Sequence, residues 1–297
     1  MSDLESTQQE ADTRVILHTI YSVKNEDVDR IIIHANDTDI IVTCVYYACT
    51  LLSNLSELWV RTAPDNYLPI HEMCAALGPA RCRALPFLHS LSGRDTTSYP
   101  YFTGKKMWVN RSKTTDVSAL GNFAEQDHTH LTADVINQAR NLMIAVYNKK
   151  DDAFEGSDLG KLHAYKFLNN KSTLLKLLPP TEDAFLLHTR RAALATLIDK
   201  TAHVAKPASP PYEEYGWVLD NGTPVPVAST QPACPQQMTN TVSCGCTKGC
   251  NRNCSCAKNN IPCYISCRCQ GSSKKCSRAM FAARFGSSEN SESENDT

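Results

Sequence analysis

The chain has 297 residues, of which 30 are Lys or Arg and 31 are Asp or Glu, so its formal net charge is −1. A chain of this length can bury a hydrophobic core in one or two domains, which excludes a small scaffold that needs cross-links to fold. No apolar run reaches the length of a membrane span, and the opening residues lack a signal-peptide pattern, so we expect an intracellular protein without a membrane partner.

Helical and strand patterns alternate over roughly the first hundred residues. Val15, Ile16 and Ile20 recur at a helical period after an acidic opening, and later apolar runs are rich in residues that favour strands. This alternation is typical of an α/β fold with a parallel sheet. The expected elements are a helix at 10–23, a strand at 30–35, a helix at 38–52, a strand at 57–62, and helices at about 70–77 and 80–92.

After Gly104 the pattern becomes helical. The final helix has a clear start, because Pro179-Pro180 is followed by Thr181 as an N-cap and by two acidic residues. The helices expected in this region cover residues 133–147, 159–168 and 182–201.

A proline-rich linker is expected to follow the helical region. Residues 217–227 then predict a hairpin, since Asn221-Gly222 can adopt the positive φ angles of a tight turn. The last residues, 286–297, have the composition of a disordered acidic tail.

Three acidic stretches fall where strands are expected to end or helices to begin: Glu10-Ala11-Asp12, Asp37-Thr38-Asp39 and Ser92-Gly93-Arg94-Asp95. In a parallel α/β sheet such positions meet at the carboxyl edge, where the carboxylates would repel one another unless cations were bound. The arrangement therefore predicts a magnesium or manganese site. The alternative is that each stretch caps a helix or forms a turn, as Asp commonly does.

The order of these motifs resembles the carboxyl half of the PIN-like nuclease domain of the flap endonuclease and XPG group. That group carries an E-A-E or E-A-D pair, a D-x-D pair and a G-x-D in this order. The stretches EADTR, HANDTDIIV, LHSLSGRDTTS and YGWVLDNGTPVPV also resemble a set of transposon-associated or domesticated animal proteins, which join this domain to a C-terminal cysteine cluster.

The resemblance implies a structure-specific nuclease that hydrolyses phosphodiester bonds with two divalent ions, magnesium or manganese. Lys105 and Lys106 lie just beyond the acidic edge and are candidate phosphate contacts, with a solvated loop as the alternative. Carried over by position, the metal-binding carboxylates would be Glu10, Asp12, Asp37, Asp39 and Asp95.

Members of that family have an earlier half-domain, whose first strand ends in another catalytic aspartate. In this chain Met1 lies only nine residues before Glu10, so the domain is expected to be N-terminally truncated relative to the family. Two interpretations stay open. The chain is either a magnesium- or manganese-dependent endonuclease that lacks its N-terminal half, or a catalytically inactive DNA-binding or partner-docking protein derived from a transposon.

Nine of the fourteen cysteines lie in the segment CGCTKGCNRNCSCAKNNIPCYISCRC and the QGSSKKC that follows it. An odd, dense set of thiols in an intracellular chain argues against disulfides and for zinc. Three tetrahedral zinc ions need twelve ligand positions, which nine thiolates fill if three of them bridge pairs of ions. The ligands would be Cys244, Cys246, Cys250, Cys254, Cys256, Cys263, Cys267, Cys269 and Cys276.

This pattern resembles the tesmin-type CXC domain, a zinc module of DNA-binding and chromatin proteins in which nine cysteines hold three zinc ions. No Asp or Glu occurs from Ser229 to Ser288, so the surroundings of the cluster are basic and favour phosphate binding. DNA-binding members usually have a tyrosine where this chain has Asn253, so non-specific binding and a purely structural role are also open. The candidate nucleic-acid contacts are Lys248, Arg252, Lys258, Arg268, Lys274 and Lys275.

The two resemblances together imply DNA as the main partner, RNA as a second one, chromatin or transposon-related protein partners, and a nuclear location. The histidines His18, His34, His71 and His89 do not form a ligand spacing and are expected to be ordinary surface or core residues. Four further cysteines fall in apolar helical stretches and are expected to be buried thiols: Cys44, Cys49, Cys74 and Cys82.

The expected architecture is therefore α/β, with a partial parallel-sheet PIN-like domain followed by a helical region and a small irregular zinc-cluster module. The predicted divisions are 1–112 for the PIN-like half-domain, 113–205 for the helical region, 206–240 for the linker with its hairpin, 241–285 for the cysteine cluster and 286–297 for the tail.

Overall fold

The protein is described by a computed structural model, which divides the chain into two compact units, residues 1–230 and residues 231–297. We refer to these as the N-terminal unit and the C-terminal unit. The predicted tail at 286–297 lies outside the described residues. The residues described are 4–26, 28–125, 129–148, 154, 156–169, 177–230, 244–247, 249–251, 253–258, 263, 267–269 and 276.

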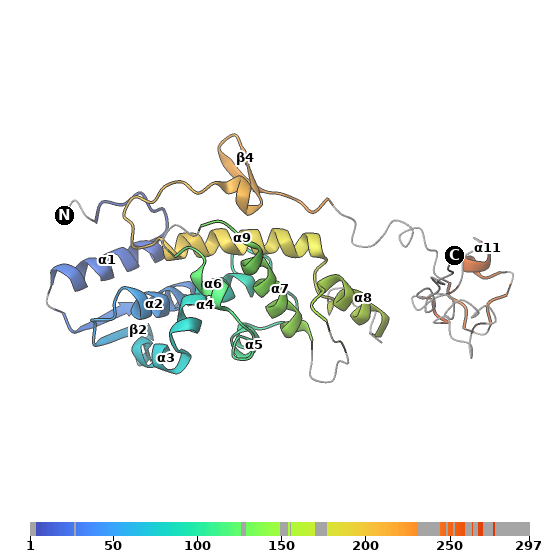
Figure 1. Cartoon of the computed structure of the whole chain (residues 1–297), viewed down its shortest axis with the longest axis horizontal. Helices are drawn as coiled ribbons and strands as arrows, with labels where there is room; N and C mark the ends of the chain where they lie inside the picture. Colours follow the sequence, from blue (N-terminus) through green and yellow to red (C-terminus); the bar gives the residue numbers. More distant parts are fainter. Residues whose placement is uncertain are drawn as a thin grey trace, which may run out of the picture. The chain divides into compact units, whose positions relative to one another are not determined.

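A three-stranded sheet lies at one end of the N-terminal unit (Figure 1). β1 (Arg30–His34) pairs in parallel with β2 (Glu57–Ala63), and β2 pairs in antiparallel with β3 (Asn66–Pro69). The parallel pair is the arrangement that the alternating pattern predicted. The sequence did not indicate β3, which follows β2 after a short turn and makes the sheet mixed.

The first hydrophobic core forms on one face of this sheet. Ile33 of β1 and Leu58 and Val60 of β2 are buried. Ile32, the neighbour of Ile33 in β1, is 46% exposed. The strands contribute to the core together with apolar residues of α1 (Ala11–Asn25), α2 (Thr38–Thr50), α3 (Ile70–Leu77) and α4 (Pro79–Leu91). The alternation of buried and exposed side chains is expected for a sheet with one covered face.

A second core lies among the helices that follow the sheet. Its largest buried side chains include Phe87, Trp108, Phe123 and Phe185, and the rings of Phe87 and Phe123 meet edge to face at 5.3 Å. The helices predicted at 133–147, 159–168 and 182–201 are present. The elements around this core are α4, α5 (Lys105–Arg111), α6 (Ser118–Asn122), α7 (Ala133–Tyr147), α8 (Leu159–Asn169) and α9 (Glu182–Lys200).

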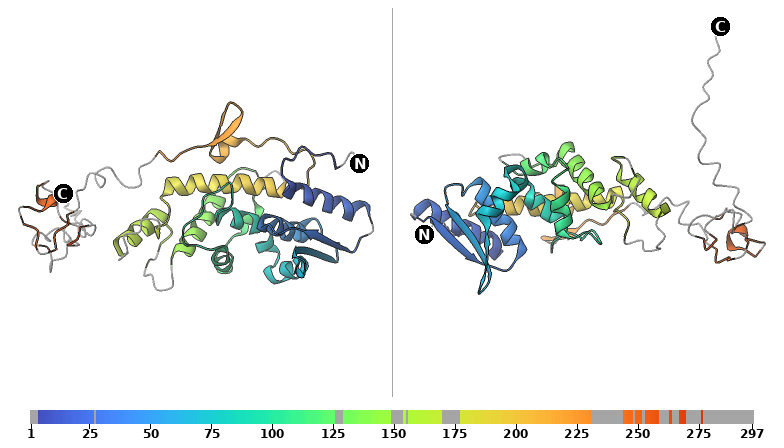
Figure 2. Two further views of the ribbon diagram at one scale, coloured as in Figure 1. Left: turned by 180° about the vertical axis from the view of Figure 1, so that it is seen from behind. Right: turned by 90° about the horizontal axis from the view of Figure 1, so that it is seen from below.

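The helix α9 connects the two cores. It runs along the other helices of the N-terminal unit as the yellow ribbon in Figures 1 and 2, packing against α4 and α7. Ala192 and Ala193 belong to the helical core, whereas Ala202, just beyond the end of α9, packs into the first core. The Tyr47 hydroxyl in α2 donates to the carbonyl oxygen of Lys200 at 2.8 Å. The sheet and the helical region are therefore one compact body.

The predicted hairpin is also present, as β4 (Trp217–Asp220) and β5 (Thr223–Pro226). Asn221 and Gly222 have φ angles of 49° and 80°, which only a few residue types adopt easily. The segment before it is not a free linker, because Tyr215 in the 3-10 helix η3 (Tyr212–Tyr215) is buried and donates to the Thr129 carbonyl oxygen at 2.6 Å.

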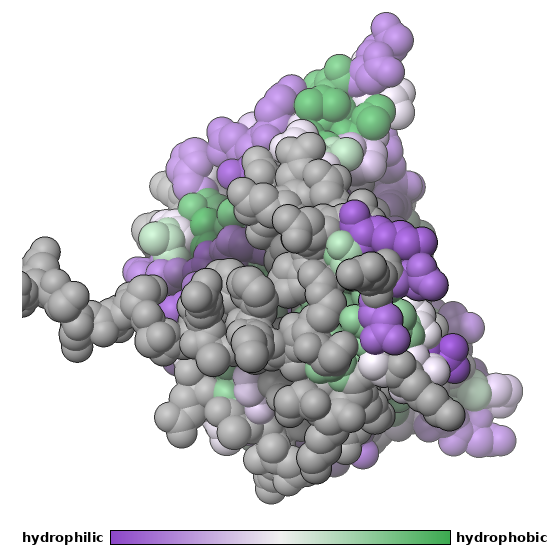
Figure 3. Space-filling model, turned by 90° about the vertical axis from the view of Figure 1, so that its right-hand side faces the viewer, coloured by the Kyte–Doolittle hydropathy of each residue, from purple (hydrophilic) through white to green (hydrophobic). Residues whose placement is uncertain are grey.

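The coloured residues of one face of the molecule are mixed in hydropathy (Figure 3). In the face shown in Figure 3, hydrophobic residues form small groups among hydrophilic ones. Within the described part of the chain, no helix has both the length and the hydropathy required to cross a bilayer.

Candidate functional site

The nine clustered cysteines converge in the C-terminal unit. Eight of them are buried, with exposed fractions between 0% and 7%, and Cys246 is half-buried. The Sγ atom of Cys244 lies 3.8 Å from those of Cys250 and Cys263 and 3.9 Å from that of Cys269. These separations are far longer than the ~2.05 Å of a disulfide bond. They match the edge of about 3.8 Å of a tetrahedron of thiolates around a zinc ion with Zn–S bonds of about 2.3 Å.

Three groups of four cysteines bring all their Sγ atoms within 4.8 Å of one another, and Cys244 belongs to all three groups. Overlapping groups are what a cluster with bridging thiolates requires, because a shared ligand must reach two ions. The groups are Cys244, Cys246, Cys250 and Cys254; Cys244, Cys250, Cys263 and Cys269; and Cys244, Cys254, Cys256 and Cys263. The cysteine cluster can thus hold a metal ion, and its donor set suits zinc.

Local backbone geometry helps to form this cluster. Gly249 has a φ of 66° and turns the chain between Cys246 and Cys250, in a conformation that glycine adopts at no steric expense. The backbone N–H of Arg268 donates to the Cys244 carbonyl oxygen at 2.8 Å, which joins the first and third C-x-C pairs. Cys267 and Cys256 are also close, with their Sγ atoms 3.5 Å apart.

The short helical turn α11 (Ser255–Lys258) affects the ionisation of Cys254. Burial raises the pKa of the Cys254 thiol, but the backbone N–H groups of Ala257 and Cys256 and the neighbouring thiols outweigh it and lower this pKa to about 6. The thiolate is the form that binds a metal, so these N–H groups favour ligation by Cys254.

Two of the predicted nucleic-acid contacts around the cluster, Lys258 and Arg268, are exposed. They are therefore accessible to a phosphate. The other four lie outside the described residues: Lys248, Arg252, Lys274 and Lys275.

The acidic stretches of the N-terminal unit come together at the carboxyl end of β1. Burial, followed by the charges of Asp37, Asp39 and Glu10, raises the pKa of Asp12 above its ordinary value. Asp95 is exposed in the loop after α4, and its charge acts on Lys105. Among the described residues, no three carboxylates at this edge bring ligand oxygens within 4.8 Å of one another.

Two of the carboxylates stand at helix N-cap positions, and one of them makes a capping hydrogen bond. Asp37 is the N-cap of α2, and its side chain accepts a hydrogen bond from the Asp39 N–H at 2.9 Å, as the capping alternative predicted. Glu10 stands at the N-cap position of α1 but makes no capping hydrogen bond through its side chain.

Asp39 is paired on both oxygens. Its Oδ1 accepts from His89 Nε2 at 2.6 Å and its Oδ2 lies 2.5 Å from the guanidinium of Arg94. Burial opposes ionisation, but the hydrogen bond from His89 and the charge of Arg94 prevail and lower the pKa of Asp39. A cation that bound through Oδ2 would have to displace Arg94.

Arg94 also pairs with Asp199 in α9, at 2.7 Å. Asp199 is buried, and burial raises its pKa to about 6 against the opposing charge of Arg94. The sequence pattern gave no indication of Asp199. This residue stands 105 positions from Arg94, in a helix that contains none of the three acidic stretches.

Lys105 also belongs to this network. It is therefore not the solvated loop residue of the alternative interpretation. It is the first residue of α5 and half-buried, and its Nζ donates to the Gly93 carbonyl oxygen at 2.8 Å and to His89 Nδ1 at 2.9 Å. His89 Nδ1 accepts this bond, so its Nε2 carries the proton donated to Asp39. His89 was expected to be an ordinary residue, yet it links Lys105 to Asp39. Lys106 is exposed.

The acidic edge thus combines a cluster of like charges around Asp12 with a closed ion-pair network around Asp39. The like charges around Asp12 attract cations. The network around Asp39 gives that carboxylate its cationic and hydrogen-bonding partners from the protein itself. No known protein family, no curated protein and no solved structure matches this chain.

Proposed function

We propose that the C-terminal unit is a zinc–thiolate module and that the protein associates with nucleic acid through it. The observation that carries this proposal is the set of overlapping cysteine groups whose Sγ atoms lie at the spacing of a zinc tetrahedron. Bound zinc would supply the links that hold this unit together, because the core formed by its described residues consists of cysteines and Ala257.

The zinc content tests the first half of the proposal. We expect the full chain, prepared under reducing conditions, to retain zinc in elemental analysis. Cys244→Ser should lose more zinc than Cys246→Ser, because Cys244 belongs to all three groups and Cys246 to one. Cys49→Ser, a substitution in α2, serves as the control and should retain the full amount. Protein without zinc, or equal losses in all three variants, would contradict the module.

Nucleic-acid association is supported by the charge around the cluster. Exposed Lys258 and Arg268 flank the thiol core, and the surrounding sequence from Ser229 to Ser288 contains no acidic residue. A zinc–thiolate cluster carries negative charge of its own, so the basic side chains must extend beyond it to attract phosphates. We expect binding to duplex DNA that weakens steeply as the salt concentration rises.

The matched test reverses two charges in each unit. Lys258→Glu/Arg268→Glu should weaken binding of a labelled DNA duplex about tenfold or more, since each phosphate contact contributes to the salt-dependent affinity. Lys113→Glu/Lys161→Glu changes two exposed lysines of the N-terminal unit and should leave the affinity within about twofold of the wild type. Equal weakening by both pairs would mean that the C-terminal unit is not the binding surface. An RNA duplex in the same assay decides which nucleic acid is preferred.

A second candidate function is hydrolysis of phosphodiester bonds at the acidic edge, with magnesium or manganese bound by Glu10, Asp12, Asp37, Asp39 and Asp95. The specific observation in its favour is the raised pKa of Asp12, which reflects burial and three neighbouring carboxylates. Arg94 and His89 argue against it as the side chains stand, because they occupy both oxygens of Asp39.

Cleavage of labelled single-stranded, duplex and flapped DNA in the presence of manganese tests this candidate. Cutting should be lost in Asp37→Asn/Asp39→Asn and kept in Asp65→Asn/Glu72→Gln, which changes two exposed acids elsewhere in the unit. Wild-type protein that is folded and holds zinc but does not cut would leave nucleic-acid binding as the function.

A further inference from the structure

The four cysteines of the N-terminal unit gather in one place. Cys44 and Cys49 belong to α2, Cys74 to α3 and Cys82 to α4, and no other cysteine occurs before residue 231. Cys44 and Cys82 are completely buried, as the sequence predicted, whereas Cys49 and Cys74 are only half-buried. Two of the four thiols are therefore accessible to a small reagent.

Cys82 lies at the centre of this group of thiols. Its Sγ donates to the Cys74 carbonyl oxygen at 3.6 Å, so the side chain extends from α4 to the backbone of α3. The thiols of Cys74 and Cys49 both form side-chain hydrogen bonds with the Cys82 thiol. The Cys74 Sγ also donates to the Val45 carbonyl oxygen in α2 at 3.4 Å. Three thiols from three helices are thus in contact through Cys82.

The turn between α3 and α4 brings Cys74 and Cys82 together. The Gly78 N–H donates to the Cys74 carbonyl oxygen at 2.9 Å, and the Cys82 N–H donates to the Gly78 carbonyl oxygen at 3.1 Å. Gly78 has a φ of 78°, which glycine adopts without steric conflict. Both cysteines are therefore held by the same turn, eight residues apart in the chain.

The arrangement suits a pair of thiols better than a metal ion. Among the described residues, no three of these four cysteines bring their Sγ atoms within 4.8 Å of one another, whereas the clustered cysteines of the C-terminal unit do so in three groups. A structural zinc ion requires four converging ligands, but a disulfide requires only two thiols.

The hydrogen bond between Cys74 and Cys82 makes their thiols unequal. It lowers the pKa of Cys74 against the effect of burial, and it raises the pKa of Cys82, to which burial adds. Burial also raises the pKa of Cys49, and it raises that of Cys44 to about 12. Cys74 therefore has the largest thiolate fraction of the four, and the thiolate is the reactive form of cysteine.

We propose that Cys74 and Cys82 are a peroxide-sensitive modification site, in which Cys74 reacts first and Cys82 then closes a disulfide between α3 and α4. The Cys74 thiolate attacks hydrogen peroxide, so that an S–O bond forms, the O–O bond breaks, and the departing hydroxide takes up the proton that Cys74 had lost. The Cys82 sulfur then attacks the sulfenic acid, so that the S–S bond forms and the S–O bond breaks. The hydroxyl leaves with the Cys82 proton as a second water, and the two electrons lost by the thiols reduce the peroxide.

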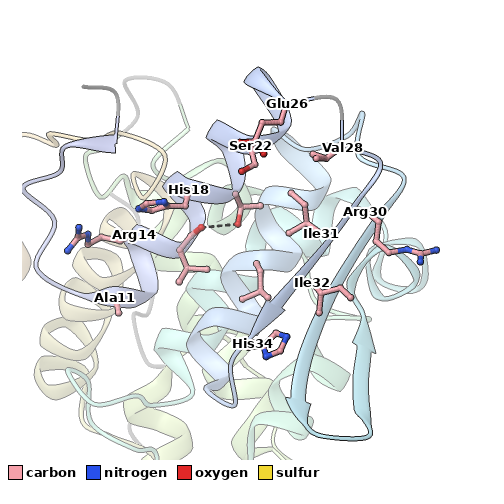
Figure 4. Close-up of a pocket in the computed structure, with 13 residues that line it drawn as sticks. Ala11, Arg14, His18, Ser22, Glu26, Val28, Arg30, Ile31, Ile32 and His34 are labelled. Atoms are coloured by element: carbon pink, nitrogen blue, oxygen red, sulfur yellow. Dashed lines mark hydrogen bonds between the residues drawn. The ribbon is translucent and has the colours of Figure 1, made fainter. Parts of the chain in front are cut away.

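This thiol pair is separate from the other features of the chain. The clustered cysteines belong to the C-terminal unit. A groove of about 680 Å³ lies between α1 and β1 (Figure 4), and none of its described lining residues is a cysteine. A measurement at the level of single cysteines therefore reports this pair independently of the zinc module.

The first test maps the disulfide by mass spectrometry in the full zinc-loaded chain. Trypsin separates the thiols, because it cuts at the arginines between them: Cys74 falls in peptide 62–81, Cys82 in 82–83, and both cysteines of α2 in 31–61. After brief treatment with hydrogen peroxide and blocking of the remaining thiols, we expect 62–81 linked to 82–83. Dithiothreitol should remove this link. Its absence, or a prevailing link between 31–61 and 82–83, would overturn the proposal.

The second test asks which thiol reacts first. Cys74→Ser should lower the yield of disulfide at Cys82 about tenfold or more, whereas Cys49→Ser, at the other half-buried thiol beside Cys82, should keep it within about twofold of the wild type. In Cys82→Ser the sulfenic acid has no partner thiol, so dimedone should label Cys74. Equal losses in Cys74→Ser and Cys49→Ser, or labelling of Cys49 in place of Cys74, would contradict the proposed order. If Cys82→Ser does not fold, the linkage in the wild type and the two half-buried variants decides the question.

Discussion

Arg94 compensates the charge of two carboxylates at the acidic edge. Its guanidinium joins Asp39 of α2 to Asp199 of α9, and the side chains of all three are mostly buried. A buried carboxylate is tolerated only when a cation or hydrogen bonds compensate for lost hydration. Arg94 therefore holds the two cores of the N-terminal unit together at the same point where it neutralises the candidate metal site.

Replacement of Arg94 by methionine should destabilise the protein strongly. Arg94→Met leaves Asp199 buried without its cation, so we expect a loss of roughly 3 kcal/mol in the free energy of unfolding at pH 8. The loss should be smaller at pH 5, because Asp199 takes up a proton there. Urea unfolding followed by tryptophan fluorescence at both pH values checks this. The control Arg94→Met/Asp199→Asn should recover part of the stability, and an equal loss at both pH values would contradict the role of Asp199.

The raised pKa of Asp199 leads to a specific prediction about how the stability of the protein depends on pH. Its pKa in the folded protein is raised to about 6, whereas a carboxylate of this type in an unfolded chain has a pKa of about 3.9. Between these values the folded state holds a proton that the unfolded state has lost, so this residue lowers the free energy of unfolding as the pH rises. Relative to Asp199→Asn, the wild type should therefore lose stability from about pH 4 to pH 7.

The same urea unfolding experiment, repeated across this pH range for both proteins, gives the difference directly. Asp39, whose lowered pKa has the opposite effect at acid pH, is present in both proteins and largely cancels. A difference that stays constant with pH would mean that Asp199 does not titrate in this range.

At the scale of elements, the helix starts explain why much of the secondary structure follows local sequence. The Thr181 side chain accepts a hydrogen bond from the Ala184 N–H at the start of α9, and Thr132 does the same for the Val135 N–H at the start of α7. Asp37 caps α2 in a related way. Each of these contacts spans only a few residues, so the identity of the capping residue is enough to set the boundary.

Removal of the α9 cap should have a measurable effect because this helix packs on both cores. Thr181→Ala should lower the free energy of unfolding by about 1 kcal/mol, since it leaves an N–H in the first turn without its partner. Thr181→Ser keeps the hydroxyl and should stay close to the wild type. Urea unfolding of the three proteins compares them, and a serine variant as unstable as the alanine variant would show that the methyl group matters more than the cap.

At the scale of the whole molecule, the two units are stabilised in different ways. The N-terminal unit has two hydrophobic cores, whereas the described residues of the C-terminal unit form a cluster of cysteines with Ala257. The first can be stable through burial of apolar surface, and under the proposed function the second depends on bonds from thiolates to a bound metal.

Chelation of zinc should therefore affect only one of the two units. A strong zinc chelator with a thiol reductant should abolish protection from hydrogen exchange around Cys244–Cys276. The three tryptophans, Trp59, Trp108 and Trp217, all lie in the N-terminal unit, so the urea midpoint seen by fluorescence should not change. A midpoint that moves with chelation would show that the N-terminal unit draws stability from the zinc module.

Local features of the sequence determined the parallel pair of strands, the main helices, the Asn221-Gly222 turn and the set of clustered cysteines. Each depends on a periodicity, a capping residue or a spacing that can be read within a short segment. The tertiary structure alone decided the contacts of the acidic edge: Arg94 with Asp199, and His89 between Lys105 and Asp39. These contacts join residues that are distant in sequence, and they depend on how α4, α5 and α9 pack. A pattern of carboxylates thus predicts where charge gathers, but packing determines which cation neutralises it.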